Sequence, residues 1–203
     1  HRFDLDETLE DRIKRELSDT LWITQSFHDT YNNLQERFDP VTLETLLEGR
    51  GKSLLRGGHE FSEFYTQKGW DFQVKSAIAE KSKRLSEKYA EIGIESSASE
   101  IEARLREMYL SSYRAEWLTF LEKVTLDPDK FGSLQAALAS LEVLVGPESP
   151  YSELFRTVWD KQAIRFSEVE QPRNLIESDF QWLDGAVKAL GGLKEALSFF
   201  IGR

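Results

Sequence analysis

The chain has 203 residues, of which 40% are hydrophobic and 31% are charged, and it carries a formal net charge of −10. Because no basic stripe compensates for this negative charge, the composition argues against nucleic acid or an anionic membrane as the main partner. The absence of cysteine excludes disulfides, thiolate zinc sites and a cysteine nucleophile. No apolar run approaches the roughly 20 residues that a membrane-spanning helix needs. Since the chain starts at His1 without a signal peptide, we expect a soluble fragment of a longer protein, or a processed chain.

The first predicted element is a long helix over residues 6–37, where apolar residues recur every three or four positions. Asp39 as N-cap and Pro40 at the first helical position then predict a short second helix that ends at Gly49. Residues 49–66 contain four glycines and are predicted to form an irregular loop.

The middle of the chain predicts two further helices with clear start and stop signals. Thr66 is expected to cap a helix over residues 67–90, and Gly93 is expected to end it. The sequence Ser97-Ala98-Ser99-Glu100 has the form of a capping box, which opens a helix predicted over residues 99–126. Aromatic residues on one face of this last helix indicate a core stripe: Tyr109, Tyr113, Trp117 and Phe120.

The C-terminal third predicts shorter helices separated by breaks. One covers residues 131–145 and ends at Gly146-Pro147, and Ser149-Pro150 opens another as cap and first residue. A loop over 165–174 precedes a helix over 175–190, and a last helix covers 193–201. No strand of period two stands out. The predicted fold is therefore all-α, an elongated multi-helix bundle of about six to eight helices.

We expect three parts in sequence order: residues 1–60 with the long helix and the glycine-rich loop, 61–164 with the core bundle, and 165–203 with helices that lead toward a domain outside this chain. The candidate hinges are 49–59, 165–174 and 191–192.

Motifs for chemistry are weak. Gly51-Lys52-Ser53 suggests a phosphate loop, but the pattern needs a glycine where Leu46 stands and a strand where a helix is predicted. His28 and His59 lack partners at metal-binding spacing, so no metal ligand and no cofactor is assigned. There is no Gly-x-Ser-x-Gly elbow, and carboxylate pairs have no specificity among 36 acidic residues. No catalytic residue is predicted.

Three stretches in order carry a resemblance. They are Phe64–Trp70 (FYTQKGW), the Tyr109-x3-Tyr113-x3-Trp117 ladder, and Ser149-Pro150-Tyr151. Together they resemble the periplasmic helical region of the IcmF/TssM family, inner-membrane components of the bacterial type VI secretion machine, over about residues 60–201 and more weakly before. Fold markers are assigned at these positions: Thr66, Gly69, Trp70, Tyr109, Tyr113, Trp117, Ser149 and Pro150.

The resemblance implies a non-enzymatic strut and assembly surface between the inner membrane and an outer-membrane lipoprotein. It places the contact with a TssJ-like lipoprotein mainly in a C-terminal domain after Arg203, and contacts with a TssL-like protein in other regions outside the chain. Self-association also remains open. Two alternatives stand beside this reading: a helical adaptor that binds a partner helix in a groove, and a carboxylate-based ligand-binding or enzymatic bundle.

Overall fold

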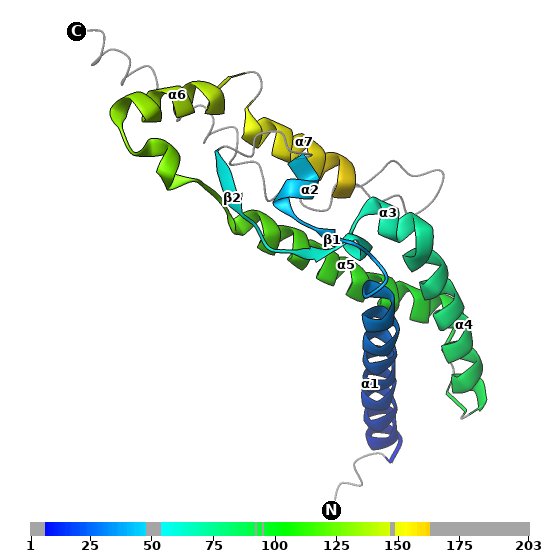
Figure 1. Ribbon diagram of the computed structural model, residues 1–203. Helices are drawn as coiled ribbons and strands as arrows, with labels where there is room; N and C mark the ends of the chain where they lie inside the picture. Colours follow the sequence, from blue (N-terminus) through cyan, green and yellow to red (C-terminus); the bar gives the residue numbers. More distant parts are fainter. Residues whose placement is uncertain (1–6, 48–53, 92, 95, 147–148, 163–203) are drawn as a thin grey trace, which may run out of the picture. The chain divides into compact units, whose positions relative to one another are not determined.

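The computed structural model describes residues 7–47, 54–91, 93–94, 96–146 and 149–162 (Figure 1). Helices dominate this part of the chain, which confirms the predicted all-α class. The α-helices are α1 (Glu7–Gln35), α2 (Leu43–Leu47), α3 (Gln67–Gly69), α4 (Lys75–Glu91), α5 (Ala98–Glu122), α6 (Leu134–Leu144) and α7 (Pro150–Gln162). Within the described residues, no helix is long and apolar enough to span a bilayer.

Short elements of other kinds lie between these helices. Two 3-10 turns cover Glu63–Tyr65 and Pro128–Phe131, and a π-helical turn, Trp70–Val74, joins α3 to α4. The strands are β1 (Pro40–Val41), β2 (Leu55–Gly57), β3 (Phe61–Ser62) and β4 (Val124–Leu126). They form two antiparallel pairs, β1 with β3 and β2 with β4.

These strands correct three sequence predictions. Pro40 lies in β1 and does not open a helix; α2 begins three residues later, where Thr42 and Thr45 cap each other reciprocally with N–H to Oγ1 distances of 2.8 and 3.1 Å. The predicted loop 49–66 contains β2 and β3. The predicted helix 99–126 ends at Glu122, because residues 124–126 pair with β2.

Several helix boundaries were predicted correctly. α4 ends in a Schellman motif, in which Gly93, at φ +75°, donates to the carbonyl of Ala90 (3.2 Å) and Ile94 donates to that of Tyr89 (2.9 Å). The capping box before α5 is present, because Glu100 N–H donates to Ser97 Oγ and Ser97 N–H donates to Glu100 Oε2. Pro150 is the first residue of α7.

The chain divides into two compact units, each built from two separate segments. Unit 1 comprises residues 1–38 and 69–112, and unit 2 comprises 39–68 and 113–203. The division falls inside α5, whose residues contribute to both. The predicted loop 165–174 and the predicted helices 175–190 and 193–201 lie outside the described residues.

The core of unit 1 is an aromatic stack drawn from α1, the π-helical turn and α5. Phe27 and Tyr31 of α1 stack with ring centroids 4.0 Å apart. Tyr109 of α5 lies 5.9 Å from Tyr31 and 5.3 Å from Trp70, and Tyr109 and Trp70 are almost completely buried. One face of each helix therefore supplies this core, as the periodicity of apolar residues predicts.

The core of unit 2 surrounds the C-terminal part of α5. Trp117 packs edge-on against Phe61 of β3 at 4.8 Å, and Phe120 lies 5.7 Å from the same ring. A separate cluster joins Leu54, Leu141 and Leu144, with Leu126, Phe131 and Tyr151 packed around it.

Candidate functional site

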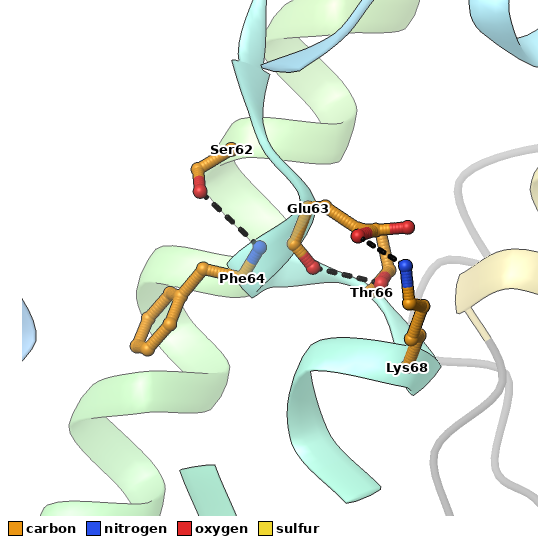
Figure 2. Close-up of polar contacts among 5 residues, drawn as sticks. All are labelled: Ser62, Glu63, Phe64, Thr66 and Lys68. Carbon is orange, nitrogen blue, oxygen red and sulfur yellow. Dashed lines mark hydrogen bonds and ion pairs between the residues drawn. The ribbon is translucent and has the colours of Figure 1, made fainter. Parts of the chain in front are cut away.

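Several polar contacts surround the fold marker Thr66 in the turn from Ser62 to Lys68, here called the Thr66 turn. Figure 2 shows its bonds: Ser62 Oγ accepts from Phe64 N–H (3.2 Å), which starts the 3-10 turn. Thr66 closes that turn, because its hydroxyl donates to the carbonyl of Glu63 at 2.7 Å. The N–H of Thr66 donates to the same carbonyl at 3.1 Å. The bonds described for Thr66 thus point backwards to the 3-10 turn.

Lys68 and Glu63 form an ion pair at the end of the Thr66 turn. Lys68 Nζ lies 2.7 Å from Glu63 Oε2, and this hydrogen bond, with the attraction of the same carboxylate, raises the pKa of Lys68. Glu63 N–H also donates to the carbonyl of Asp39 at 2.8 Å, which ties the turn to the residue before β1. The turn is therefore held by a local ion pair and by a backbone hydrogen bond to a distant segment.

The fold marker Trp117, on α5, holds the Thr66 turn through a hydrogen bond. Its indole Nε1–H donates to the carbonyl of Tyr65 at 2.7 Å, a buried bond between residues 52 positions apart. Trp117 is fully buried, as is its neighbour Tyr113, whose ring centroid lies 6.4 Å away. A buried donor needs a partner, so this bond ties α5 to the Thr66 turn.

A pocket of about 380 Å³ in unit 2 is lined in part by residues of the Thr66 turn. Its walls come from β1, α2, the Thr66 turn and the end of α7: Asp39, Pro40, Val41, Thr45, Leu46, Glu63, Thr66, Gln67, Lys68, Asp160 and Lys161. The wall of the pocket carries both acidic and basic side chains, and Glu63 is already paired with Lys68. The pocket therefore has no strong preference for an anionic or a cationic ligand.

A second polar contact joins His59 to Glu116 of α5. His59 Nε2 is 3.2 Å from Glu116 Oε2, and both side chains are partly exposed. Burial, and to a smaller extent the Glu116 carboxylate, raises the pKa of Tyr65 to about 12. His28 is exposed on α1, with its ring edge-on to Phe27.

The remaining fold markers occupy distinct places. Gly69 and Trp70 are buried at the start of the π-helical turn, and Pro150 is buried at the start of α7. Ser149 stands at the predicted cap position, but its hydroxyl has no hydrogen-bond partner in the described part of the chain. Its carbonyl accepts from Glu153 instead (3.0 Å), so Pro150 marks the helix start and the hydroxyl cap does not form.

The arrangement brings some markers together and leaves others apart. Trp70 and Tyr109 meet in unit 1, while Thr66 and Trp117 are joined through Tyr65 in unit 2. Sequence reasoning missed the Trp117–Tyr65 bond and the His59–Glu116 pair, since no local pattern marks contacts over such separations.

The described residues contain no group of three or more His, Asp or Glu side chains placed to hold a metal ion. The Gly51-Lys52-Ser53 motif lies outside the described residues. What the described site can do is connect elements: Trp117 joins α5 to the Thr66 turn, and Glu63 joins that turn to Asp39.

Comparison with known proteins gives a consistent picture. The model of the family described as "IcmF-related: Intracellular multiplication and human macrophage-killing" matches residues 2–163. Comparison with curated proteins found no match. The fold is similar to a chain of a solved "Type VI secretion system membrane core complex", with a TM-score of 0.65 and 15% sequence identity, over 89% of this chain and 37% of the other.

Proposed function

The chain belongs to the IcmF-related family, and on this premise we propose that it is a structural, non-catalytic module of a type VI secretion membrane complex. In this proposal the module lies in the periplasm and serves as a strut and assembly surface between the inner membrane and the outer-membrane lipoprotein. The observation that carries the proposal is the fold similarity over 89% of the chain, combined with the family match over residues 2–163. The motif resemblance noted from the sequence is confirmed at the level of the family.

The character of the core supports a structural role. Tyr109, Tyr113 and Trp117 are all fully buried, and the indole N–H of Trp117 bonds to backbone. Such tightly packed aromatic cores resist deformation because interiors have low compressibility. A ligand-binding or enzymatic bundle would instead need convergent polar groups with shifted pKa values in a pocket. In the pocket lined by the Thr66 turn, the raised pKa of Lys68 comes from its ion pair with Glu63, which the two side chains form with each other.

The chain spans 37% of the chain to which its fold is similar. We assign the contact with a TssJ-like lipoprotein, and that with a TssL-like protein, to regions outside these residues. Contacts between copies of the module remain part of the proposal.

The location is tested with the whole protein carrying Lys83→Cys in a background without other reactive cysteines. Lys83 is exposed on α4, and the chain itself has no cysteine. We expect a maleimide that cannot cross the inner membrane to label this position once the outer membrane is permeabilised. Labelling only after lysis of the inner membrane would contradict a periplasmic position.

The structural role is tested by comparing two classes of variant in a type VI secretion assay. Trp117→Ala should abolish secretion together with loss of the assembled complex, because it removes core packing. Asp39→Asn and Asp160→Asn, which change the pocket wall, should leave secretion and assembly intact. Loss of secretion in the pocket variants with a normally assembled complex would favour a ligand-binding or catalytic role.

A further inference from the structure

Helix α6 is unusually poor in charge. Its sequence, LQAALASLEVL, contains Glu142 as its only charged residue. One face is buried in unit 2 through Leu141 and Leu144, which contact Leu54. Ser140, on the same face, donates its hydroxyl to the carbonyl of Lys130 at 2.9 Å. This face accounts for only part of the apolar surface of the helix.

Leu134 lies seven residues before the buried Leu141 and therefore on the same face of the helix, so large apolar side chains continue along that face past the buried cluster. Leu134 is 55% exposed and Val143 is 48% exposed, on opposite flanks of the helix. Leu138 and Val145 are half-buried and share the flank of Leu134, at helical spacings of four and eleven residues. A helix that is apolar on most sides is normally enclosed by other elements, so the flank of Leu134, Leu138 and Val145 calls for a covering element.

We propose that this α6 flank is the docking site for residues 175–190 of the same chain. These residues lie outside the described ones, and their sequence predicts an amphipathic helix. Its apolar face would carry Phe180, Leu183, Val187 and Leu190, all at spacings of three or four. An amphipathic helix must bury that face, and the exposed flank of α6 offers apolar surface of matching length.

The connection is long enough for this contact. α7 ends at Gln162 and packs against α6. The 12 residues from 163 to 174 can span up to about 40 Å. The length of α7 itself is only about 20 Å, so residue 175 can reach either end of α6.

A second copy of the chain fits this surface less well. An 11-residue helix is about 16 Å long and about 10 Å wide, so its free face offers on the order of 160 Å² of flat area. A stable interface between separate chains buries at least about 1,000 Å². A covalently tethered segment needs far less area, because the tether supplies a high effective concentration.

The proposal is tested by cysteine labelling in the full chain, which has no native cysteine. Leu134→Cys reports on the flank, and Gln135→Cys, an adjacent exposed polar position, is the matched control. We expect Leu134→Cys to react with a maleimide roughly tenfold more slowly than Gln135→Cys, since labelling then requires local opening. Adding Val187→Asp should restore the rate at Leu134→Cys and leave Gln135→Cys unchanged.

Three results would overturn the proposal. Equal labelling rates at the two positions would mean that nothing covers the flank. Protection that persists with Val187→Asp would mean that another element covers it. Protection that disappears on dilution would assign the flank to a second copy. Circular dichroism of each variant checks that α6 remains folded, and Phe180→Asp serves as an independent second disruption.

Discussion

Trp117 combines core packing with a long-range hydrogen bond in unit 2. It is fully buried between Phe61 and Phe120 and donates to the carbonyl of Tyr65. We expect Trp117→Ala to lower the free energy of unfolding by about 3–5 kcal/mol, because it leaves a cavity in the core and removes the hydrogen bond to the Tyr65 carbonyl. Urea-induced unfolding followed by circular dichroism measures this change.

Two further variants separate the contributions of packing and hydrogen bonding. Trp117→Phe keeps an aromatic ring but removes the donor, so a loss of about 1–3 kcal/mol is expected. Phe72→Ala is the control, since Phe72 is 79% exposed and should change stability by less than about 0.5 kcal/mol. Unchanged unfolding of Trp117→Ala, with only partner binding reduced, would make Trp117 an interface residue.

Gly57 and Gly93 form a matched pair for a second prediction. Both have positive φ, +86° and +75°, but a Cβ at Gly57 would lie 2.4 Å from the carbonyl oxygen of Lys123, whereas a Cβ at Gly93 would meet open space. We expect Gly93→Ala to cost about 1–2 kcal/mol from backbone strain alone, and Gly57→Ala to cost clearly more. Thermal unfolding of both variants tests which loses more stability. Equal losses would show that the β2–β4 pair shifts at little cost to make room for the added Cβ at Gly57.

At the scale of the element, the start of α5 depends on the capping box of Ser97 and Glu100. Their reciprocal bonds, 2.9 and 3.2 Å long, satisfy two N–H groups that the helix leaves unpaired. We expect Ser97→Ala to destabilise the chain by about 1 kcal/mol and to speed hydrogen exchange in the first turn of α5. Ser99→Ala is a control, because its hydroxyl contacts only that of Ser97 among the bonds described.

The same capping box predicts a pH dependence. Hydrogen bonds from the backbone and side chain of Ser97 lower the pKa of Glu100. A carboxyl whose pKa is depressed in the folded state contributes stability above its unfolded pKa, and this contribution is lost as the pH falls through the folded pKa. NMR titration should therefore find Glu100 ionising below an ordinary glutamate, and Ser97→Ala should return its pKa toward the normal range. A normal pKa in the unmodified chain would contradict the capping geometry.

At the scale of the whole molecule, buried tyrosines should make the fold sensitive to high pH. Burial raises the pKa of Tyr65 to about 12, raises that of Tyr113 well above its ordinary value, and also raises that of Tyr151. The folded state therefore retains the phenolic protons at pH values where the unfolded chain has already released them. The contribution of these tyrosines to the free energy of unfolding is thus fully present below about pH 10, and it is lost as the pH rises further.

Absorbance titration near alkaline pH measures this effect. We expect part of the tyrosine ionisation to coincide with loss of helical circular dichroism rather than to precede it. Tyr65→Phe should remove the part of this alkaline destabilisation that comes from Tyr65. Because the pKa of Tyr65 rises by about two, this part is at most about 3 kcal/mol. Complete tyrosine ionisation at pH 10 in a folded chain would contradict the burial of these phenols.

The amino-acid sequence by itself determined the helical class, the family and several of the helix boundaries in the described part of the chain. Ser97, Glu100, Gly93 and Pro150 act within one turn of their own positions, so local bonding and backbone geometry are sufficient to predict where those helices start or stop. The burial of Tyr109, Tyr113 and Trp117 follows in the same way from their spacing along one helix face.

Only the tertiary structure decided where long-range pairing replaces local preference. Residues 124–126 continue the helical pattern of α5, yet they form β4 because Leu126 pairs with Leu55. Pro40 has the signature of a helix start, yet it joins β1 opposite Ser62. Strands of two or three residues are too short to show a period of two, and their backbone hydrogen bonds come from distant segments. The bond between Trp117 and Tyr65 and the division of α5 between two units have the same origin: partners that meet only once the chain has folded.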